Sequence, residues 1–160
     1  MSSTEKQFKK NLEYGELGED LVHHFLISTF DYVEDNRFQR RDYKAGPKLR
    51  GRKAGRSGIN LPDFTAYNSG QPPILIDAKV KTKPFNLDGK LYFAVDDYKF
   101  DDYLQCAQIK GAVDVWIAII YNSDIYIYTS ADIKKRHVFN NEYGNAAYLF
   151  EFDVTKIIKF

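Results

Sequence analysis

The stretch that decides the fold is residues 61–81, LPDFTAYNSGQPPILIDAKVK. Two runs in it, 63–67 and 74–80, have the composition of β-strands, and the turn formers NSGQPP separate them. This pattern predicts a β-hairpin whose turn is centred near Gly70. Asp63 and Asp77 each lie seven residues from Gly70, so we expect their carboxylates to face each other across the antiparallel pair.

The second run of this hairpin places charged side chains on one face. Because side chains alternate along a strand, Asp77, Lys79 and Lys81 share a face, and the residues between them lie on the other. Two carboxylates and an ammonium are costly to bury unless they pair or bind a cation. Oxygen ligands without nearby Cys or clustered His favour Mg²⁺ or Mn²⁺ over zinc, so we expect a site for one of these ions.

Regular elements are predicted on both sides of the hairpin. Apolar residues recur at helical spacing before it, with a break around Gly15 and Gly18, and indicate one main helix over about 15–29. The elements expected elsewhere are a short strand near 37–43, strands at 91–95, 113–121, 124–129 and 147–152, a helix over about 98–110 ended by Gly111, and a short helical turn that Ser130 could cap. This order predicts an α/β (α+β) fold in one domain of residues 1–160, with a central mixed β-sheet flanked by helices.

The residues Pro62 and Asp63, followed after thirteen intervening residues by Asp77, Ala78 and Lys79, resemble the signature of the PD-(D/E)xK nuclease superfamily. The resemblance covers about residues 15–129 and leaves the tail, 147–160, outside. It implies a restriction-endonuclease-like core, as in Holliday junction resolvases. The activity it implies is metal-dependent hydrolysis of DNA phosphodiester bonds.

The resemblance also assigns roles to residues. Asp63, Asp77 and the main-chain carbonyl of Ala78 would hold one or two Mg²⁺ or Mn²⁺ ions, and Lys79 would orient the attacking water and stabilise developing charge. The helix before the hairpin would supply a third acid, Glu19, with Glu16 as an alternative that the sequence does not separate from it. Gln105 or Gln108 on the following helix could join the site.

A basic, glycine-rich loop over residues 37–58 indicates nucleic-acid binding. Nine basic residues and one acid, Asp42, give residues 37–56 a charge of +8, and because the whole chain carries +1, the other 140 residues carry −7. This loop is either a solvated flexible segment or a phosphate-binding loop, and we favour the second. The predicted DNA-binding residues are Arg37, Arg40, Arg41, Lys44, Lys48, Arg50, Arg52, Lys53 and Arg56, with Lys81 and Lys83 beyond Lys79 as further phosphate contacts or ordinary surface lysines.

Other sites are less favoured by the sequence. The acidic stretch 96–103 is expected off the DNA face or near the start of the second helix. Cys106 is the single cysteine, so a disulfide framework is excluded and a buried thiol is expected. His23 and His24 point apart on a helix and are expected to be structural or surface residues. No apolar segment resembles a signal or a membrane span, and the cytoplasm of a bacterial, archaeal or phage-infected cell is the expected location.

The sequence thus predicts a metal-dependent DNA endonuclease. A junction-resolving or phage-type enzyme acting as a homodimer on branched or duplex DNA fits the composition, and restriction or homing endonucleases remain open. Two alternatives belong to other classes. One is a nucleic-acid-binding protein that keeps the fold without activity, and the other is a module that binds RNA or a protein through the basic loop.

Overall fold

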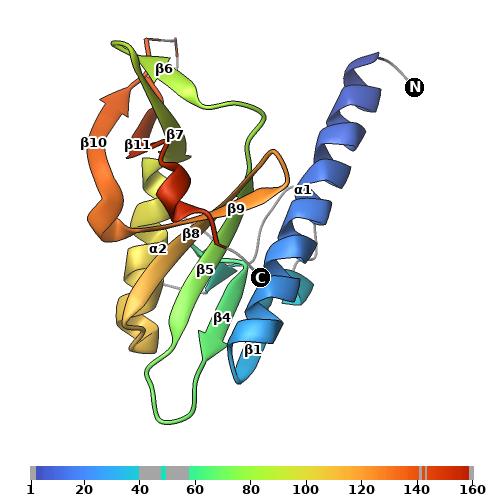
Figure 1. Cartoon of the computed structure of the whole chain (residues 1–160), viewed down its shortest axis with the longest axis vertical. Coiled ribbons are helices and arrows are strands. Elements are labelled where there is room, and N and C mark those ends of the chain that lie inside the picture. The colour runs from blue at the N-terminus through green and yellow to red at the C-terminus, as the bar shows by residue number, and fades with distance from the viewer. Residues whose placement is uncertain (1–2, 40–47, 50–57, 141, 143, 159–160) are drawn as a thin grey trace.

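The computed structural model describes residues 3–39, 48–49, 58–140, 142 and 144–158, and only the backbone of 4–5, 7–14, 38–39 and 48–49. Figure 1 shows the elements in space. The helices are α1 (Ser3–Thr29) and α2 (Asp97–Lys110), with short 3₁₀ turns η1 (Asn36–Gln39), η2 (Ser130–Asp132) and η3 (Val154–Lys156). The strands are β1 (Tyr32–Asp35), β2 (Lys48–Leu49), β3 (Ile59–Asn60), β4 (Phe64–Tyr67), β5 (Ile74–Val80), β6 (Phe85–Leu87), β7 (Lys90–Asp96), β8 (Asp114–Tyr121), β9 (Asp124–Thr129), β10 (Ile133–Val138) and β11 (Ala146–Glu151).

A five-stranded central sheet has the order β1-β4-β5-β8-β9. β5 pairs in parallel with β8, and the other neighbours are antiparallel, so the sheet is mixed. The helices α1 and α2 lie on opposite faces of this sheet (Figure 1). The predicted class, an α/β fold with a mixed central sheet flanked by helices, is confirmed.

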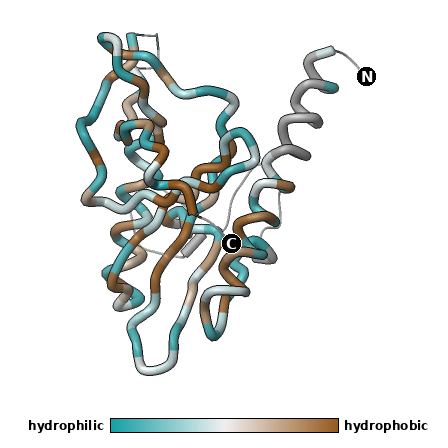
Figure 2. Tube along the Cα trace, in the orientation of Figure 1, coloured by the Kyte–Doolittle hydropathy of each residue, from teal (hydrophilic) through white to brown (hydrophobic). Residues whose placement is uncertain are grey.

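Each face of the central sheet has its own hydrophobic cluster. On the α1 face, Val22 and Leu26 pack against Ile76 and Ala78 of β5. On the α2 face, Leu75 and alternate residues of β8 and β9 pack against α2. Figure 2 shows apolar residues concentrated in the strands between the helices. The alternation of β5 therefore directs its odd-numbered residues, including the predicted site residues, towards α2.

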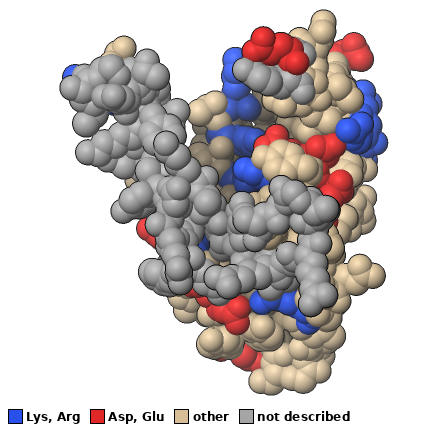
Figure 3. Space-filling model, turned by 180° about the vertical axis from the view of Figure 1, so that it is seen from behind, with Lys and Arg blue, Asp and Glu red and all other residues tan. Residues whose placement is uncertain are grey.

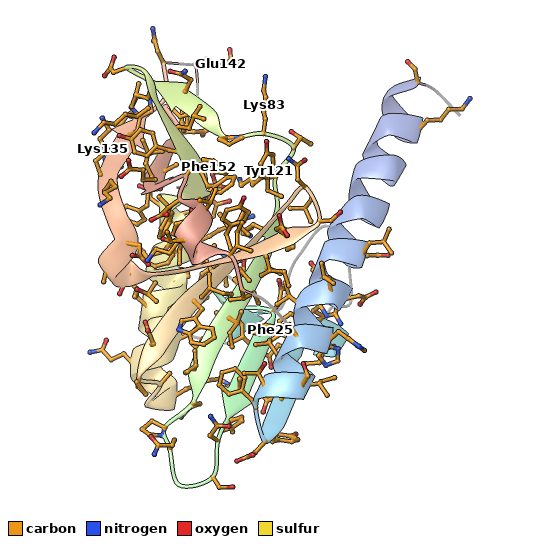
Figure 4. All side chains as sticks on the ribbon, viewed as in Figure 1. Phe25, Lys83, Tyr121, Lys135, Glu142 and Phe152 are labelled. Atoms are coloured by element: carbon orange, nitrogen blue, oxygen red, sulfur yellow. The ribbon has the colours of Figure 1, made fainter. Side chains whose placement is uncertain are left out.

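A second sheet, of order β10-β11-β7-β6, packs beside the first. Its core is aromatic: the ring of Phe93 lies 5.8 Å from Tyr121 and 5.7 Å from Phe152, and Tyr121 and Phe152 also contact each other (Figure 4). The sequence predicted β7 and β11 but missed β6 and β10. β10 (IKKRHV) is largely exposed and shows no apolar alternation, so its place in the sheet depends on pairing with β11.

The predicted hairpin is confirmed. β4 and β5 are antiparallel, with Phe64 opposite Ile76, so the pairing is centred where the sequence placed it. Gly70 has φ +75°, which a residue without a Cβ adopts at little cost. The strands β8 and β9 lie where the sequence predicted strands; β8 pairs in parallel with β5, and β9 is antiparallel to β8.

The N-terminal region differs from the prediction. α1 begins at Ser3 rather than near Gly15 and continues through both glycines. A glycine inside a helix costs only about 1 kcal/mol, and Gly18 has a packing role, because a Cβ there would collide with Val80 and approach Ile120. The strand predicted near 37–43 is wrong over 37–39, which belong to η1, and residues 40–43 lie outside the described residues. The strand in this region is β1, which ends at Asp35.

The remaining predicted ends agree with the structure. α2 is closed by Gly111 in the left-handed conformation, φ +67°. The short turn η2 follows β9, but its N-cap is Thr129 rather than Ser130. Within the described residues, no helix has the length and apolar character needed to span a membrane.

Candidate active site

Asp63 and Asp77 lie side by side at the end of the β4–β5 hairpin. Their exposed fractions are 4% and 3%. The backbone N–H of Asp63 donates to Asp77 Oδ1 at 3.3 Å, and the backbone N–H of Ala78 donates to Asp63 Oδ2 at 3.1 Å. The two carboxylates therefore face each other across the hairpin, as the sequence indicated.

Lys79 completes the predicted triad. Its ammonium lies 3.0 Å from Asp77 Oδ2 and 6.0 Å from the centre of the Tyr103 ring. Burial works to lower the pKa of Lys79, but attraction to Asp77 and Asp63 outweighs burial and raises that pKa. Asp77 Oδ2 is buried, and the Asp77 carboxylate interacts with both the Lys79 ammonium and the hydroxyl of Tyr103.

The two acids perturb each other. Burial raises the pKa of Asp63 well above its usual value, and the neighbouring charges of Asp77 and Glu19 raise it further. Asp63 consequently retains a proton more readily than a solvated carboxyl. A buried pair of carboxylates with one ammonium is an electrostatically incomplete arrangement that a divalent cation would complete.

Tyr103 is a site residue that the sequence analysis missed. It lies on the buried side of α2, and burial raises the pKa of its hydroxyl well above the usual value, with Asp77 and Asp63 adding to the shift. The predicted Gln105 and Gln108 are both exposed, and α2 turns Tyr103 towards Asp77 instead. A sequence pattern could have identified Tyr103, because the helical spacing of Phe100, Tyr103 and Ala107 marks the buried face of α2.

Two further lysines lie close to the triad. Lys81 follows Lys79 on the same face of the extended chain, where its backbone N–H donates to the Ile120 carbonyl at 2.9 Å. Lys99, on the first turns of α2, lies one turn before Tyr103 and was not predicted. Burial lowers the pKa of both Lys81 and Lys99, and repulsion from Lys79 lowers it further. By contrast, Lys83 is exposed and points away from the body of the protein (Figure 4).

Arg37 differs from its predicted role in DNA binding. Its guanidinium is only 14% exposed and contacts three acids of the α1 side: both oxygens of Asp35 at 2.8–2.9 Å, Asp20 at 2.9 Å and Glu19 at 3.5 Å. It also lies 4.9 Å from the centre of the Phe64 ring. These contacts occupy its donors, so we correct the assignment of Arg37 from DNA contact to structural ion-pair residue.

Glu19 and Glu16 are separated by the structure. Glu16 is exposed, whereas Glu19 is half-buried, pairs with Arg37 and is close enough to raise the pKa of Asp63. Glu19 is nevertheless carried by α1, on the opposite face of the sheet from Lys79. In the described part of the chain, no three His, Cys, Asp or Glu side chains gather closely enough to hold one metal ion. Glu19 therefore influences Asp63 through its charge but does not form a three-ligand cluster with Asp63 and Asp77.

Asn36 positions Asp63 and was also missed. This buried residue donates its backbone N–H to the Asp63 carbonyl at 2.9 Å and its side-chain amide to the Pro62 carbonyl at 3.1 Å. The same amide lies 3.1 Å from Thr65 Oγ1. A single Asn after a short strand forms no recognisable sequence pattern, so the hydrogen bonds by which Asn36 positions Asp63 are apparent only in the folded structure.

Seven of the predicted DNA-binding residues lie outside the described residues: Arg40, Arg41, Lys44, Arg50, Arg52, Lys53 and Arg56. Of Lys48 only the backbone is described, in the β2–β3 pair.

The acidic stretch at the start of α2 is largely engaged in structural contacts. Asp97 pairs with Arg136 at 2.8 Å, and the buried Asp102 accepts hydrogen bonds from the backbone and side chain of Asn60. The stretch forms the start of α2, which is one of the two positions predicted for it, and it also contributes Lys99 and Tyr103 to the site. Cys106 is buried as expected, and burial raises the pKa of its thiol to about 11.

The chain has remote structural similarity to a protein of known structure. No family model matches the chain, and no curated protein matches it in sequence. A solved structure of Hjc, a Holliday junction resolvase from the archaeal hyperthermophile Archaeoglobus fulgidus, aligns with 66% of this chain and 74% of its own, at 16% identity and a TM-score of 0.43.

Proposed function

We propose that the protein is a metal-dependent nuclease that hydrolyses phosphodiester bonds of DNA. The observation that carries this proposal is the pair of buried carboxylates of Asp63 and Asp77, which share the single ammonium of Lys79. Buried acids without full compensation reduce stability, and they are common where a ligand or a reaction needs them.

The donor set fits a hard divalent cation. Asp63 and Asp77 would hold Mg²⁺ or Mn²⁺ together with the carbonyl of Ala78, and Mg²⁺ characteristically uses one or two carboxylates and fills its other positions with water and phosphate oxygens. The burial of both carboxylates and the raised pKa of Asp63 suit a site that gains a positive charge. Glu19 would act through water from its place beside Arg37.

The chain's own residues account for the rest of the reaction. A bound cation would supply Lewis-acid activation of water and neutralise charge on the phosphate. Lys79, tied to Asp77 and flanked by the Tyr103 ring, would orient the attacking water and stabilise charge that develops on the phosphate oxygens. Asn36 would keep Asp63 in register through its bonds to the Asp63 and Pro62 carbonyls. Tyr103, beside Asp77, would restrict solvent at the pair.

DNA is the proposed substrate because a basic segment follows α1 in the sequence, near the first strand of the site. The nine basic residues between 37 and 56, apart from Arg37, are the proposed backbone contacts. Branched DNA and duplex DNA are both candidate substrates, and cutting two strands symmetrically would need two active sites, hence a homodimer. The proposed location is the cytoplasm.

The test is cleavage of a supercoiled plasmid and of a four-way DNA junction in Mg²⁺, Mn²⁺ or EDTA. Wild type is compared with Asp77→Ala and Lys79→Ala, and folding of each variant is checked by circular dichroism. The proposal predicts metal-dependent cutting that both substitutions abolish. DNA binding without cleavage in either metal would favour an inactive binding protein of the same fold, and preference for RNA in competition would reject the DNA assignment.

A further inference from the structure

Lys81 and Lys99 come from two different elements and meet at one edge of the site. Lys81 continues the face of β5 that carries Asp77 and Lys79, the face covered by α2. Lys99 is four residues before Tyr103, so it lies on the same side of α2. Each lysine interacts electrostatically with Lys79 and with Asp96, and Lys81 also interacts with Lys99. Three ammoniums therefore converge beside the two buried acids.

The charges of these two lysines are not compensated in the way that other cations of the protein are. Lys79, Lys110, Lys156 and the two arginines Arg37 and Arg136 each have an acid within 4.0 Å. Neither Lys81 nor Lys99 has an ion pair among the described residues, although both are half-buried. Partial burial of an unpaired ammonium is unfavourable, and the lowered pKa of each lysine reflects this cost. A bound anion would remove the cost of burying these two ammonium groups.

The anion that fits is a phosphodiester. Lys81 and Lys99 with the nearby Asp96 give a local charge of +1, which matches the single negative charge of one phosphodiester group. Lys99 lies near the N-terminal end of the fourteen-residue helix α2, where the helix dipole also favours a negative charge. Figure 3 shows Lys and Arg side chains gathered in a hollow on the face opposite that of Figure 1, with Asp and Glu side chains next to them.

The position relative to Lys79 identifies which phosphate. Lys79 is already bound to Asp77 and is assigned to the phosphate that is cut. Lys81 lies two residues further along the strand, an advance of about 6.6 Å, which is similar to the step between neighbouring phosphates of one nucleic-acid strand. We propose that Lys81 and Lys99 together bind the phosphate adjacent to the scissile one. This inference rests on the proposed nuclease function and adds the subsite that fixes the strand.

The first test measures DNA binding in EDTA, where no cleavage occurs. Lys81→Gln, Lys99→Gln and the double variant are titrated with a fluorescent four-way junction at several salt concentrations, with Lys90→Gln, an exposed lysine on β7, as the matched control. Each single substitution is expected to weaken binding about 5- to 10-fold and to reduce the salt slope by about one, while the control stays within about twofold of wild type. Unchanged affinity and salt slope in both single variants would overturn the subsite.

The second test modifies the DNA and keeps the protein wild type. A neutral methylphosphonate is placed one nucleotide to either side of the cleaved bond, and binding is measured for wild type and Lys99→Gln. At one of the two positions, the methylphosphonate should weaken binding by wild type about as much as Lys99→Gln weakens binding to unmodified DNA. Lys99→Gln on the modified DNA should then bind only slightly more weakly than with either change alone. Fully additive losses at both positions would contradict the contact, and this result does not depend on how Lys81→Gln folds.

The two proposals fail in different ways. A protein that never cuts DNA but loses salt-dependent binding in Lys81→Gln and Lys99→Gln would retain the phosphate subsite and reject the nuclease. A protein that cuts DNA but binds equally well without either lysine would retain the nuclease and reject the subsite. The thermal midpoint of Lys99→Gln should equal or exceed that of wild type, because the substitution removes an unpaired ammonium.

Discussion

The two faces of the central sheet carry charged side chains in different states. On the α1 face, Arg37 joins Asp35, Asp20 and Glu19 in a network in which its guanidinium is fully engaged. On the α2 face, Asp63 and Asp77 are both buried and share the one ammonium of Lys79. We expect charges of the first kind to stabilise the fold and charges of the second kind to lower its stability, as at a site that would gain a cation. This difference between the two faces favours the α2 face as the position of the functional site.

The largest effect is expected on the incompletely paired face. Asp77→Asn keeps the shape of the side chain but removes a ligand charge and the partner of Lys79. Cleavage should fall about 10³-fold, equivalent to ~4 kcal/mol in the activation barrier. Single-turnover cleavage of a junction substrate measures this, with Asp88→Asn, an exposed residue in the β6–β7 turn, as the control. Loss of activity in both variants alike would contradict the assignment.

A large effect on stability is expected on the paired face. Arg37→Gln leaves Asp35 and Glu19 without their cation, and the free energy of unfolding should fall by about 2 to 4 kcal/mol. Urea unfolding measures the change. The control is Arg136→Gln, whose guanidinium is 55% exposed and pairs with Asp97, and which should cost less than about 1 kcal/mol. Equal losses in the two variants would remove the distinction between a network and a surface pair.

The Arg37 network also predicts a dependence on acid pH. Burial works to raise the pKa of Asp35, but hydrogen bonds from Arg37 outweigh burial and hold that pKa below 3.8. Its contribution to stability is therefore present above the unfolded-state pKa and is lost as the pH falls below about 3.8 towards the folded-state value. In Arg37→Gln this part of the acid destabilisation should shrink. An identical acid profile in wild type and variant would contradict the ion pair.

Asp63→Asn is expected to raise the free energy of unfolding, whereas Arg37→Gln lowers it. Because the folded-state pKa of Asp63 is raised, its contribution to stability is present below the unfolded-state value of about 3.9 and is lost as the pH rises through the folded-state pKa. The neutral amide avoids that loss. At pH 7 in EDTA, the variant should unfold about 2 to 6 °C higher than wild type, a gain of about 1 to 2 kcal/mol. Mg²⁺ should stabilise wild type but not the variant in the same thermal scans.

The smallest effect is expected for Tyr103→Phe. The substitution keeps the ring beside Lys79 and removes the hydroxyl near Asp77. Cleavage should fall about 3- to 10-fold with little change in stability. Tyr98→Phe, on the exposed side of the same helix, serves as the control and should behave as wild type. A loss of about 10³-fold in Tyr103→Phe would instead make the hydroxyl a direct participant in the reaction.

The sequence predicted the parts of the site that depend on local pattern. Alternation along β5 and symmetry about Gly70 were enough to bring Asp63 and Asp77 together and to put Lys79 on their face. Parts that depend on tertiary packing were missed. Lys99 and Tyr103 lie at the site because burial of Phe100 and Cys106 fixes the rotation of α2 about its axis. Arg37 is not assigned to DNA binding because three acids from α1 and β1 surround its guanidinium.

The fold shows the same division. Strands with strong apolar character, such as β8, were predicted, whereas β1, β6 and β10 are short or polar and form only through pairing with their neighbours. The extension of α1 to Ser3 was missed because Gly15 and Gly18 were read as a helix break. Gly18 is used instead for the close contact with Val80 and Ile120, which no helix propensity encodes.

The measurement that tests the central claim most directly is Mn²⁺ binding followed by electron paramagnetic resonance. Wild type, Asp63→Asn and Asp77→Asn are titrated with Mn²⁺ at pH 7 without DNA, and the free-ion signal reports how much metal is bound. The account predicts saturable binding to wild type that weakens at least about 10-fold in each variant and is displaced by Mg²⁺. Binding that is equal in all three proteins, or absent in wild type at millimolar Mn²⁺, would contradict a metal site at the Asp63 and Asp77 pair.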